Sequence, residues 1–422
     1  GIWRRFIWSS LGRSVHMNNF GIVYRYEVKK ILSRKLTGIV FLICVSCVLL
    51  FTLADLSGNY YVDGDVVDTH YHMFQVDQGY RRALSGRALD QQLLEEMAAA
   101  YQKIPAMAER YNLTDEYQTY ARPYSEIFNL VRVWTQQWDL DKLQAWEPDE
   151  GALYSARMGN LEKEWQAQHL TDAEKAFWRE QEARTQTPLV YYYHEGYRKI
   201  ISHGLNTIGL LVLLFVCICM SSVFAEEHAR RTDQLILSSA KGKSVAYWAK
   251  LAAGVSVSGV CAVVLSAVTF GVVFLIYGAD GFDASLRLCL YLWTSSCTLS
   301  IGQACLAAYG ILIVTAVVVS VLMLVLSERL HSSIAALSVG VGLIMAGGVV
   351  QIPYQYRAAA QLWDWAPWRY LNAENIFDIR MLPVFGSCFA SWQIVPVLYV
   401  LAAVAAAFAG KIIYRNYQVS GR

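Results

Sequence analysis

Six runs of apolar residues, each near the length that crosses a lipid bilayer, constrain this 422-residue chain more than any other feature. A helix needs roughly 17–25 predominantly apolar residues to span the hydrocarbon core, where it satisfies its own backbone hydrogen bonds. Hydrophobic residues make up 55% of the chain and charged residues only 17%, unlike a typical soluble protein. The runs lie at 38–54, 204–225, 251–277, 301–326, 333–352 and 392–413. We therefore predict an all-α integral membrane protein with six transmembrane helices.

Charge is divided unevenly along the chain. Residues 55–203 hold 24 acidic and 15 basic side chains, a net charge of −9. The rest of the chain holds 10 acidic and 21 basic side chains, a net charge of +11. This division predicts a large acidic domain in solvent, inserted between the first two spans, and a membrane body with basic edges.

The Lys and Arg residues near the span ends predict the orientation, because cytoplasmic loops carry an excess of them. The segment before the first span carries eight and the 226–250 connector carries five, whereas the 278–300 loop has only Arg287. We therefore expect both termini, the connector and the 327–332 link in the cytoplasm, and the 55–203 domain outside the cell membrane.

The predicted layout follows from these spans and this orientation. It runs as a cytoplasmic segment 1–37, helix 38–54, extracellular domain 55–203, helix 204–225, cytoplasmic connector 226–250, helix 251–277, extracellular or re-entrant segment 278–300, helices 301–326 and 333–352, extracellular aromatic loop 353–391, helix 392–413 and cytoplasmic tail 414–422.

Helix-start signals predict a large, mostly helical extracellular domain. Asp90 is a suitable N-cap, and Thr171 with Glu174 forms a capping-box pattern. The 55–76 stretch is expected to be extended or irregular. Helical runs are expected over 90–104, over 115–138 with a bend at Pro123, over 151–169, and after Thr171.

The sequence shows no catalytic or nucleotide-binding pattern. Gly242-Lys243-Ser244 mimics the end of a phosphate-binding loop, but Leu237 occupies the position where that motif needs its first Gly. No constellation of acid, base and nucleophile occurs in the spans, so we expect no enzyme activity, cofactor or metal site in this chain. The spans also lack the charged residues near mid-membrane that ion-coupled transporters usually carry.

All nine cysteines lie outside 55–203, and most fall in apolar spans, where a thiol behaves as a small hydrophobic group. The acidic domain is therefore not a disulfide-stapled one. We interpret Cys44-x-x-Cys47, inside the first span, as packing. Pairing among Cys289, Cys297 and Cys388 stays open.

The 226–250 connector places acids early and bases late, an order that suits the dipole of a helix. Glu226 and Glu227 lead, and Arg230 and Arg231 follow. A soluble motor can move membrane helices only through a rigid cytoplasmic protrusion, and this segment suits that role. The alternative is an ordinary solvated loop that obeys the positive-inside rule.

Two stretches together carry a family pattern. The connector contains Phe224-x-x-Glu227, Thr232, Leu235-x-Leu237-Ser238, Lys241-Gly242-Lys243 and Lys250-Leu251. The N-terminal stretch contains Tyr24, Tyr26, Glu27, Lys29 and Lys30, followed by Arg34-Lys35. Both resemble ABC-2-type permeases, the membrane subunits of many bacterial ABC exporters, in which the second stretch is an amphipathic helix on the inner membrane surface. The chain departs from the family at Arg231, where Gly is usual.

The resemblance implies the permease subunit of an ATP-driven exporter in a bacterial plasma membrane. ATP and Mg²⁺ would bind a separate ATP-binding subunit, and the permease would work as a dimer with itself or with a sister chain. The residues implied in coupling to the ATPase are Glu226, Glu227, Arg230, Arg231, Thr232, Asp233, Ser238, Lys241, Gly242 and Lys243.

The nearly uncharged spans favour a hydrophobic or amphipathic substrate: a lipid, a peptide antibiotic or a drug-like compound. We expect the lipid bilayer, and no nucleic acid, among the partners. The alternative function is a membrane sensor or scaffold whose outer domain binds a ligand or partner.

Two stripes of small residues at four-residue spacing would let helix backbones approach closely. They face either a second subunit or neighbours in the same bundle. The aromatic segment 362–370 either anchors the chain at the membrane interface or lines a path for an amphipathic substrate. The stripes consist of Gly254, Ser258 and Ala262, and of Ser338, Gly342 and Ala346.

Overall fold

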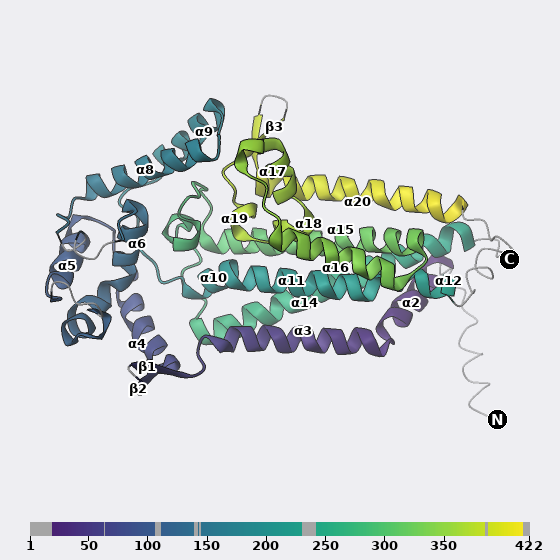
Figure 1. The fold of residues 1–422 in the computed structure, drawn as a ribbon, viewed down its shortest axis with the longest axis horizontal. Coiled ribbons are helices and arrows are strands. Elements are labelled where there is room, and N and C mark those ends of the chain that lie inside the picture. The colour runs from purple at the N-terminus through teal and green to yellow at the C-terminus, as the bar shows by residue number, and fades with distance from the viewer. Residues whose placement is uncertain are drawn as a thin grey trace, which may run out of the picture.

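The computed structural model is an elongated, mostly helical molecule whose long helices run side by side along its long axis (Figure 1). A body of shorter helices, formed by the chain between α3 and α11, lies at one end of this bundle and is called the end body below. The structure describes residues 19–62, 64–105, 111–138, 142, 145–229, 242–384 and 387–416.

Within these residues, five helical segments are long and apolar enough to cross a membrane. The prediction of a helical, multi-span protein is thus confirmed in outline. One of the five segments consists of four consecutive elements: α10 (Glu195–Lys199), η4 (Ile200–Gly204), α11 (Leu205–Met220) and α12 (Ala225–Ala229). The other four contain α3 (Lys35–Ala54), α14 (Tyr247–Tyr277, preceded by η5, Gly242–Ala246), α15 (Ile301–Leu330) and α20 (Ser391–Asn416).

The predicted 333–352 span differs from the other five. α16 (Ser333–Val349) has 17 residues, and Pro353 follows it closely. The chain then turns by 119° into a second helical piece, which contains η8 (Tyr354–Tyr356) and α17 (Arg357–Asp364). The count of membrane-length helices is therefore five, or six if this bent pair forms one span.

α15 lies at the centre of the bundle and packs against α11, α14 and α20. Small residues allow the close approach of α14. A Cβ atom added at Gly254 would lie 2.7 Å from Leu324 Cδ1, and Ser258 and Ala262 are fully buried. This stripe therefore packs within its own bundle. In the stripe on α16, by contrast, Ser338 and Gly342 are exposed.

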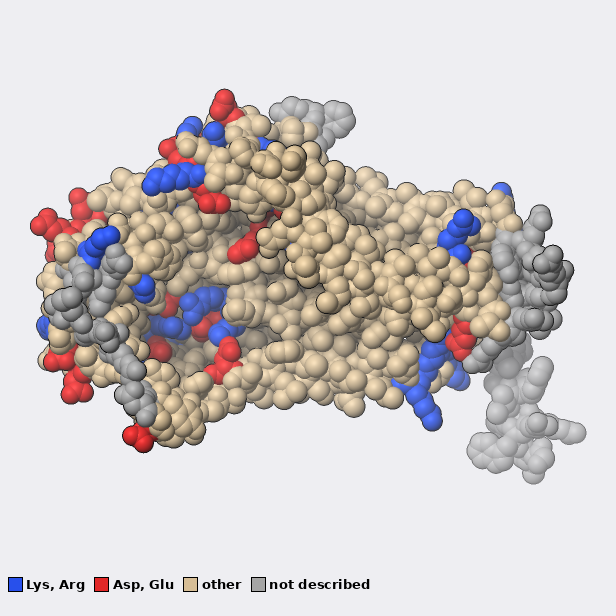
Figure 2. Space-filling view, viewed as in Figure 1, with Lys and Arg blue, Asp and Glu red and all other residues tan. Residues whose placement is uncertain are grey.

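Charged side chains gather toward the two ends of the long axis, and the face between them is almost free of them (Figure 2). Exposed apolar side chains of α3, α16 and α20 contribute to the surface of the long helices, among them Leu42, Leu50, Met345 and Val404. Such a band avoids the cost of placing charge in hydrocarbon. The structure and the composition together indicate a multi-pass membrane protein.

The end body is helical after a short hairpin. The hairpin pairs β1 (Asn59–Val62) with β2 (Asp65–Thr69), and a helix already begins at His70, so the expectation of an irregular stretch to residue 76 is wrong beyond Thr69. The Thr69 side chain accepts a hydrogen bond from the His72 amide and so starts this helix. The helices are α4 (His70–Ala83), α5 (Gln91–Tyr101), α6 (Ser125–Thr135), α8 (Glu150–Ala167) and α9 (Asp172–Ala183).

Local signals set the helix starts in the end body as predicted. Asp90 caps α5 by accepting from the Leu93 amide at 3.0 Å, and Thr171 and Glu174 form the capping box of α9. The predicted bend at Pro123 is a change from π-helix (η2, Tyr117–Ala121) through 3₁₀-helix (η3, Arg122–Tyr124) to α6. That this body lies outside the cell stays a prediction.

The end body contacts the segments of the chain that precede α15 and α20. The 278–300 segment forms two 3₁₀ turns, η6 (Leu286–Leu288) and η7 (Leu290–Leu292), rather than a membrane-length helix. Before α20 come α18 (Pro367–Tyr370), α19 (Ala373–Ile376) and the β3–β4 hairpin (Met381–Val384 and Ser387–Ala390). Cys289, Cys297 and Cys388 are free thiols.

Glu182 of α9 makes an ionic link between the end body and the segment before α15. Its carboxylate accepts from Arg157 of α8 at 2.6 Å and from Arg287 of η6 at 3.1 Å. Nearby, the Trp178 indole donates to the Ile379 carbonyl at 2.7 Å. Both arginines are nearly fully buried, so each needs the shared carboxylate to offset its loss of hydration.

Replacing Arg287 with Met should lower the free energy of unfolding by roughly 2 kcal/mol, because Glu182 would keep only one of its two cations in a buried site. Unfolding of the detergent-solubilised protein, followed by tryptophan fluorescence, measures this. The matched control is Arg184→Met, whose pair with Glu180 is exposed and should matter little. Equal effects of the two substitutions would contradict the buried link.

The same carboxylate predicts a pH dependence. Burial alone would raise the pKa of Glu182, but Arg157 and Arg287 outweigh burial and hold this pKa below its ordinary value of 4.5. A group with a lowered folded-state pKa stabilises the fold above its unfolded pKa and loses that contribution as the pH falls through the folded pKa. The stability difference between wild type and Glu182→Gln should therefore shrink below about pH 4.5. Unfolding midpoints across an acidic pH series test this, and a constant difference would contradict it.

Candidate functional site

Three segments that are far apart in the sequence meet at the end of the bundle opposite the end body (Figure 1). They are α2 (Asn19–Leu32), α12 and the start of α14. α2 packs along α14, and the Tyr24 hydroxyl donates to Ser256 Oγ at 3.0 Å. This packing brings the predicted surface helix against the first turn of the predicted connector.

Lys250 is the centre of the meeting point. Its side chain is 0% exposed, and its ammonium group donates to Glu27 Oε1 at 2.7 Å and to Glu227 Oε1. Glu227 Oε1 also accepts from Lys30 at 2.5 Å. We call Glu27, Lys30, Glu227 and Lys250 the buried ion network. With two charges of each sign it is neutral overall, as groups withdrawn from water need to be.

A second contact reinforces the same junction. Arg34, the residue before α3, donates to Glu226 Oε2 and to Ser222 Oγ, both at 2.7 Å. The corner between α2 and α3 is thereby tied to the end of the α11 segment. Polar contacts thus link α14 to α2 and α12, and they link the start of α3 to α12 and to the turn after α11.

The predicted site residues fall into three groups. The first group takes part in the polar contacts between α2, α12 and α14 or in the contact with Arg34, and consists of Tyr24, Glu27, Lys30, Glu226 and Glu227. Tyr26 and Lys29 instead lie on the exposed face of α2. Gly242 and Lys243 lie in η5, of which only the backbone is described at these two positions. The remaining predicted residues lie outside the part of the chain that the structure describes: Arg230, Arg231, Thr232, Asp233, Ser238 and Lys241.

Lys250 and Arg34 are not among the predicted site residues. Lys250 carried a usable signal, because a lysine at the start of an apolar run either reaches for the membrane surface or needs a buried acid. Its partners could not be identified in advance, since Glu27 lies 223 positions away along the chain.

A hollow of about 740 Å³ lies nearer the end body, bounded by α11, α16 and the segment from Gln351 to Asn375. Trp368 and Tyr354 contribute aromatic surface to it, and Asn206 and Glu374 contribute polar groups. One part of the predicted aromatic segment therefore lines a cavity that has both apolar and polar walls.

Comparison of this chain with models of protein families, with curated proteins and with solved structures finds no match. The resemblance to ABC-2-type permeases rests on the motif residues of the sequence and stays a prediction.

Replacing Lys250 with Met should lower the free energy of unfolding by about 3–5 kcal/mol, because two carboxylates would lose their buried cation. Adding Glu227→Gln to this variant should restore part of the loss by removing one of those charges. The unfolding midpoint in detergent measures both effects. Lys29→Met, on the exposed face of α2, is the control, and a Lys250→Met variant as stable as this control would contradict the role given to the network.

Proposed function

We propose that this protein is the membrane subunit of an ATP-driven exporter similar to the ABC-2-type permeases. The observation that carries the proposal is the buried ion network, which joins the two stretches that resemble this family. A force applied to α12 would pass to α2 through Glu227 and Lys30 and to α14 through Glu227 and Lys250. A receiver for the movement of a soluble ATPase needs such a stiff junction.

In this proposal the chain crosses the membrane six times, with α16 and the piece that follows it as one broken span. The end with α2, α12 and the 226–250 connector faces the cytoplasm, and the end body lies outside. The basic residues around the first span support this orientation. The stripe of exposed Ser338 and Gly342 and half-buried Ala346 on α16 is the surface we propose for a second permease subunit, since small residues let helices approach closely.

The hollow beside Trp368 and Tyr354 is the substrate-facing surface in this proposal. Aromatic faces bind apolar groups, and Asn206, Glu374 and neighbouring backbone groups offer hydrogen bonds. This mixture favours an amphipathic substrate over a purely apolar one. ATP and Mg²⁺ would bind only to the partner subunit.

The experiment is a mild-detergent purification from the native host followed by mass spectrometry. We expect a stoichiometric partner with a phosphate-binding loop, which would then be reconstituted with the permease in liposomes. A preparation that keeps a kinase or regulator and lacks such an ATPase would contradict the exporter and favour the sensor or scaffold.

The reconstituted complex also tests the junction by charge reversal. Glu226→Arg should reduce permease-stimulated ATP hydrolysis severalfold, because two cations would face each other across the contact with Arg34. Adding Arg34→Glu should recover most of the activity by restoring the pair in reverse. Lys29→Glu is the control for a charge change on the same surface. Equal activity of the single and double variants would contradict coupling through this contact.

A further inference from the structure

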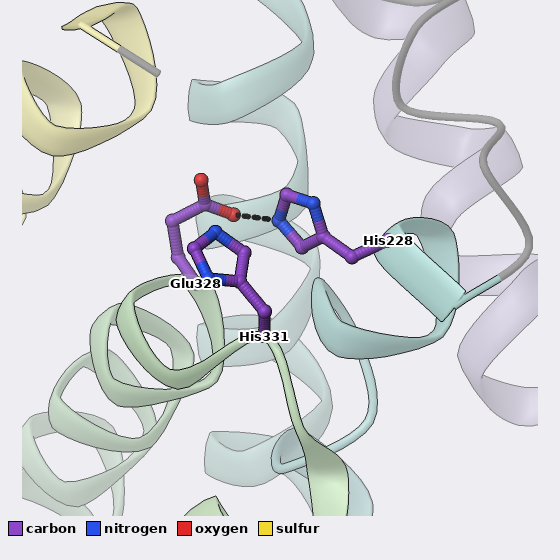
Figure 3. A group of neighbouring side chains, drawn as sticks. All are labelled: His228, Glu328 and His331. Atoms are coloured by element: carbon purple, nitrogen blue, oxygen red, sulfur yellow. Dashed lines mark hydrogen bonds and ion pairs between the residues drawn. The ribbon is translucent and has the colours of Figure 1, made fainter. Parts of the chain in front are cut away.

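Three side chains with metal-binding atoms converge beside the buried ion network (Figure 3). His228 comes from α12, Glu328 from the last turn of α15, and His331 from the turn after it. Their ligand atoms all lie within 4.8 Å of one another. The two imidazole rings are edge to face with centroids 4.2 Å apart, and His228 Nε2 lies 3.0 Å from Glu328 Oε2.

The carboxylate in this group is fully buried. Glu328 has no solvent exposure, and among the described residues its Oε1 has no hydrogen-bond partner. A buried carboxylate oxygen without a donor is costly, because its hydration is lost and not replaced. A cation placed between this oxygen and the two imidazoles would remove that cost.

The backbone holds the three side chains in place without help from an ion. His331 has a left-handed backbone (φ 52°) as the residue that ends α15, a conformation that histidine adopts more readily than most residues. Ser327 Oγ accepts from the Ala225 amide at 3.1 Å and donates to the Ser221 carbonyl at 2.7 Å. These bonds fix α12 against α15, so the ligands from the two segments are pre-positioned.

We propose that His228, Glu328 and His331 bind a divalent transition-metal ion, with Zn²⁺ as the best match. Two imidazoles and one carboxylate suit zinc, cobalt or nickel better than magnesium or calcium, which prefer oxygen ligands alone. A tetrahedral zinc site needs ligand atoms roughly 3.4 Å apart, which rotation of exposed His331 can reach. Three protein ligands leave the fourth position open to water or another ligand.

The bound ion would link the start of the connector to the turn between α15 and α16. This inference rests on the geometry of the three side chains and does not depend on the exporter proposal. The sequence alone did not predict this metal site. Glu328 and His331 stand three positions apart, but 100 positions separate His228 from Glu328, so the sequence does not bring the third ligand to the other two.

The test uses the full-length protein in detergent, stripped with a chelator and then titrated with Zn²⁺ alone or Co²⁺ alone. We expect one ion per chain by elemental analysis and the visible absorption of tetrahedral Co²⁺. His228→Gln, Glu328→Gln and His331→Asn should each weaken Zn²⁺ binding by at least roughly tenfold. Asn tolerates the left-handed backbone, so His331→Asn removes the ligand while keeping the fold.

His169→Asn is the matched control. His169 also has a left-handed backbone (φ 55°), but it follows α8 in the end body and belongs to no such group among the described residues. This variant should bind Zn²⁺ like wild type. Zn²⁺ uptake by wild type that does not exceed uptake by His331→Asn would overturn the proposal, and the group would then be only an ion pair between protonated His228 and Glu328.

Discussion

The burial of one ammonium group, that of Lys250, sets the arrangement of the helix ends at one side of this molecule. An ammonium removed from water is stable only beside carboxylates, and here these come from α2 and α12. Their positions require α2 to lie along α14 and α12 to lie beside the start of α14. Apolar packing alone would hold these helices together, but it would leave their sliding and rotation less restricted than directional ion pairs do.

α12 has five residues, yet it is held from two sides. Glu227 contacts α2 and α14, whereas the next residue, His228, contacts Glu328 at the end of α15. Successive residues on a helix point about 100° apart, so neighbouring side chains serve different partners. The beginning of the connector is thus held between α2 and α14 on one side and the end of α15 on the other.

The opposite end of the bundle is organised by the same kind of interaction. Two ionic contacts hold the end body to the segments that precede α15 and α20. Glu182 lies between Arg157 and Arg287, and Glu174 pairs with Arg357 at 2.5 Å. Along the bundle between the two ends, the face in view is almost free of charged side chains (Figure 2). Polar contacts thus fix both ends, while helix packing through small and aliphatic side chains fills the middle.

The membrane-length helices and several of their starts could be predicted from the sequence, because they depend on residues close together in the chain. Apolar length predicted α3, α11, α14, α15 and α20, and side-chain caps predicted the starts of α5 and α9. Three other features could not be predicted: the 119° turn of the chain after α16, the packing of Gly254 inside the bundle, and the contact of Lys250 with Glu27. The position of His228 beside Glu328 could not be predicted either. These features depend on which helix faces lie together, and residues some 100 to 220 positions apart leave no periodic or spacing signal from which that can be read.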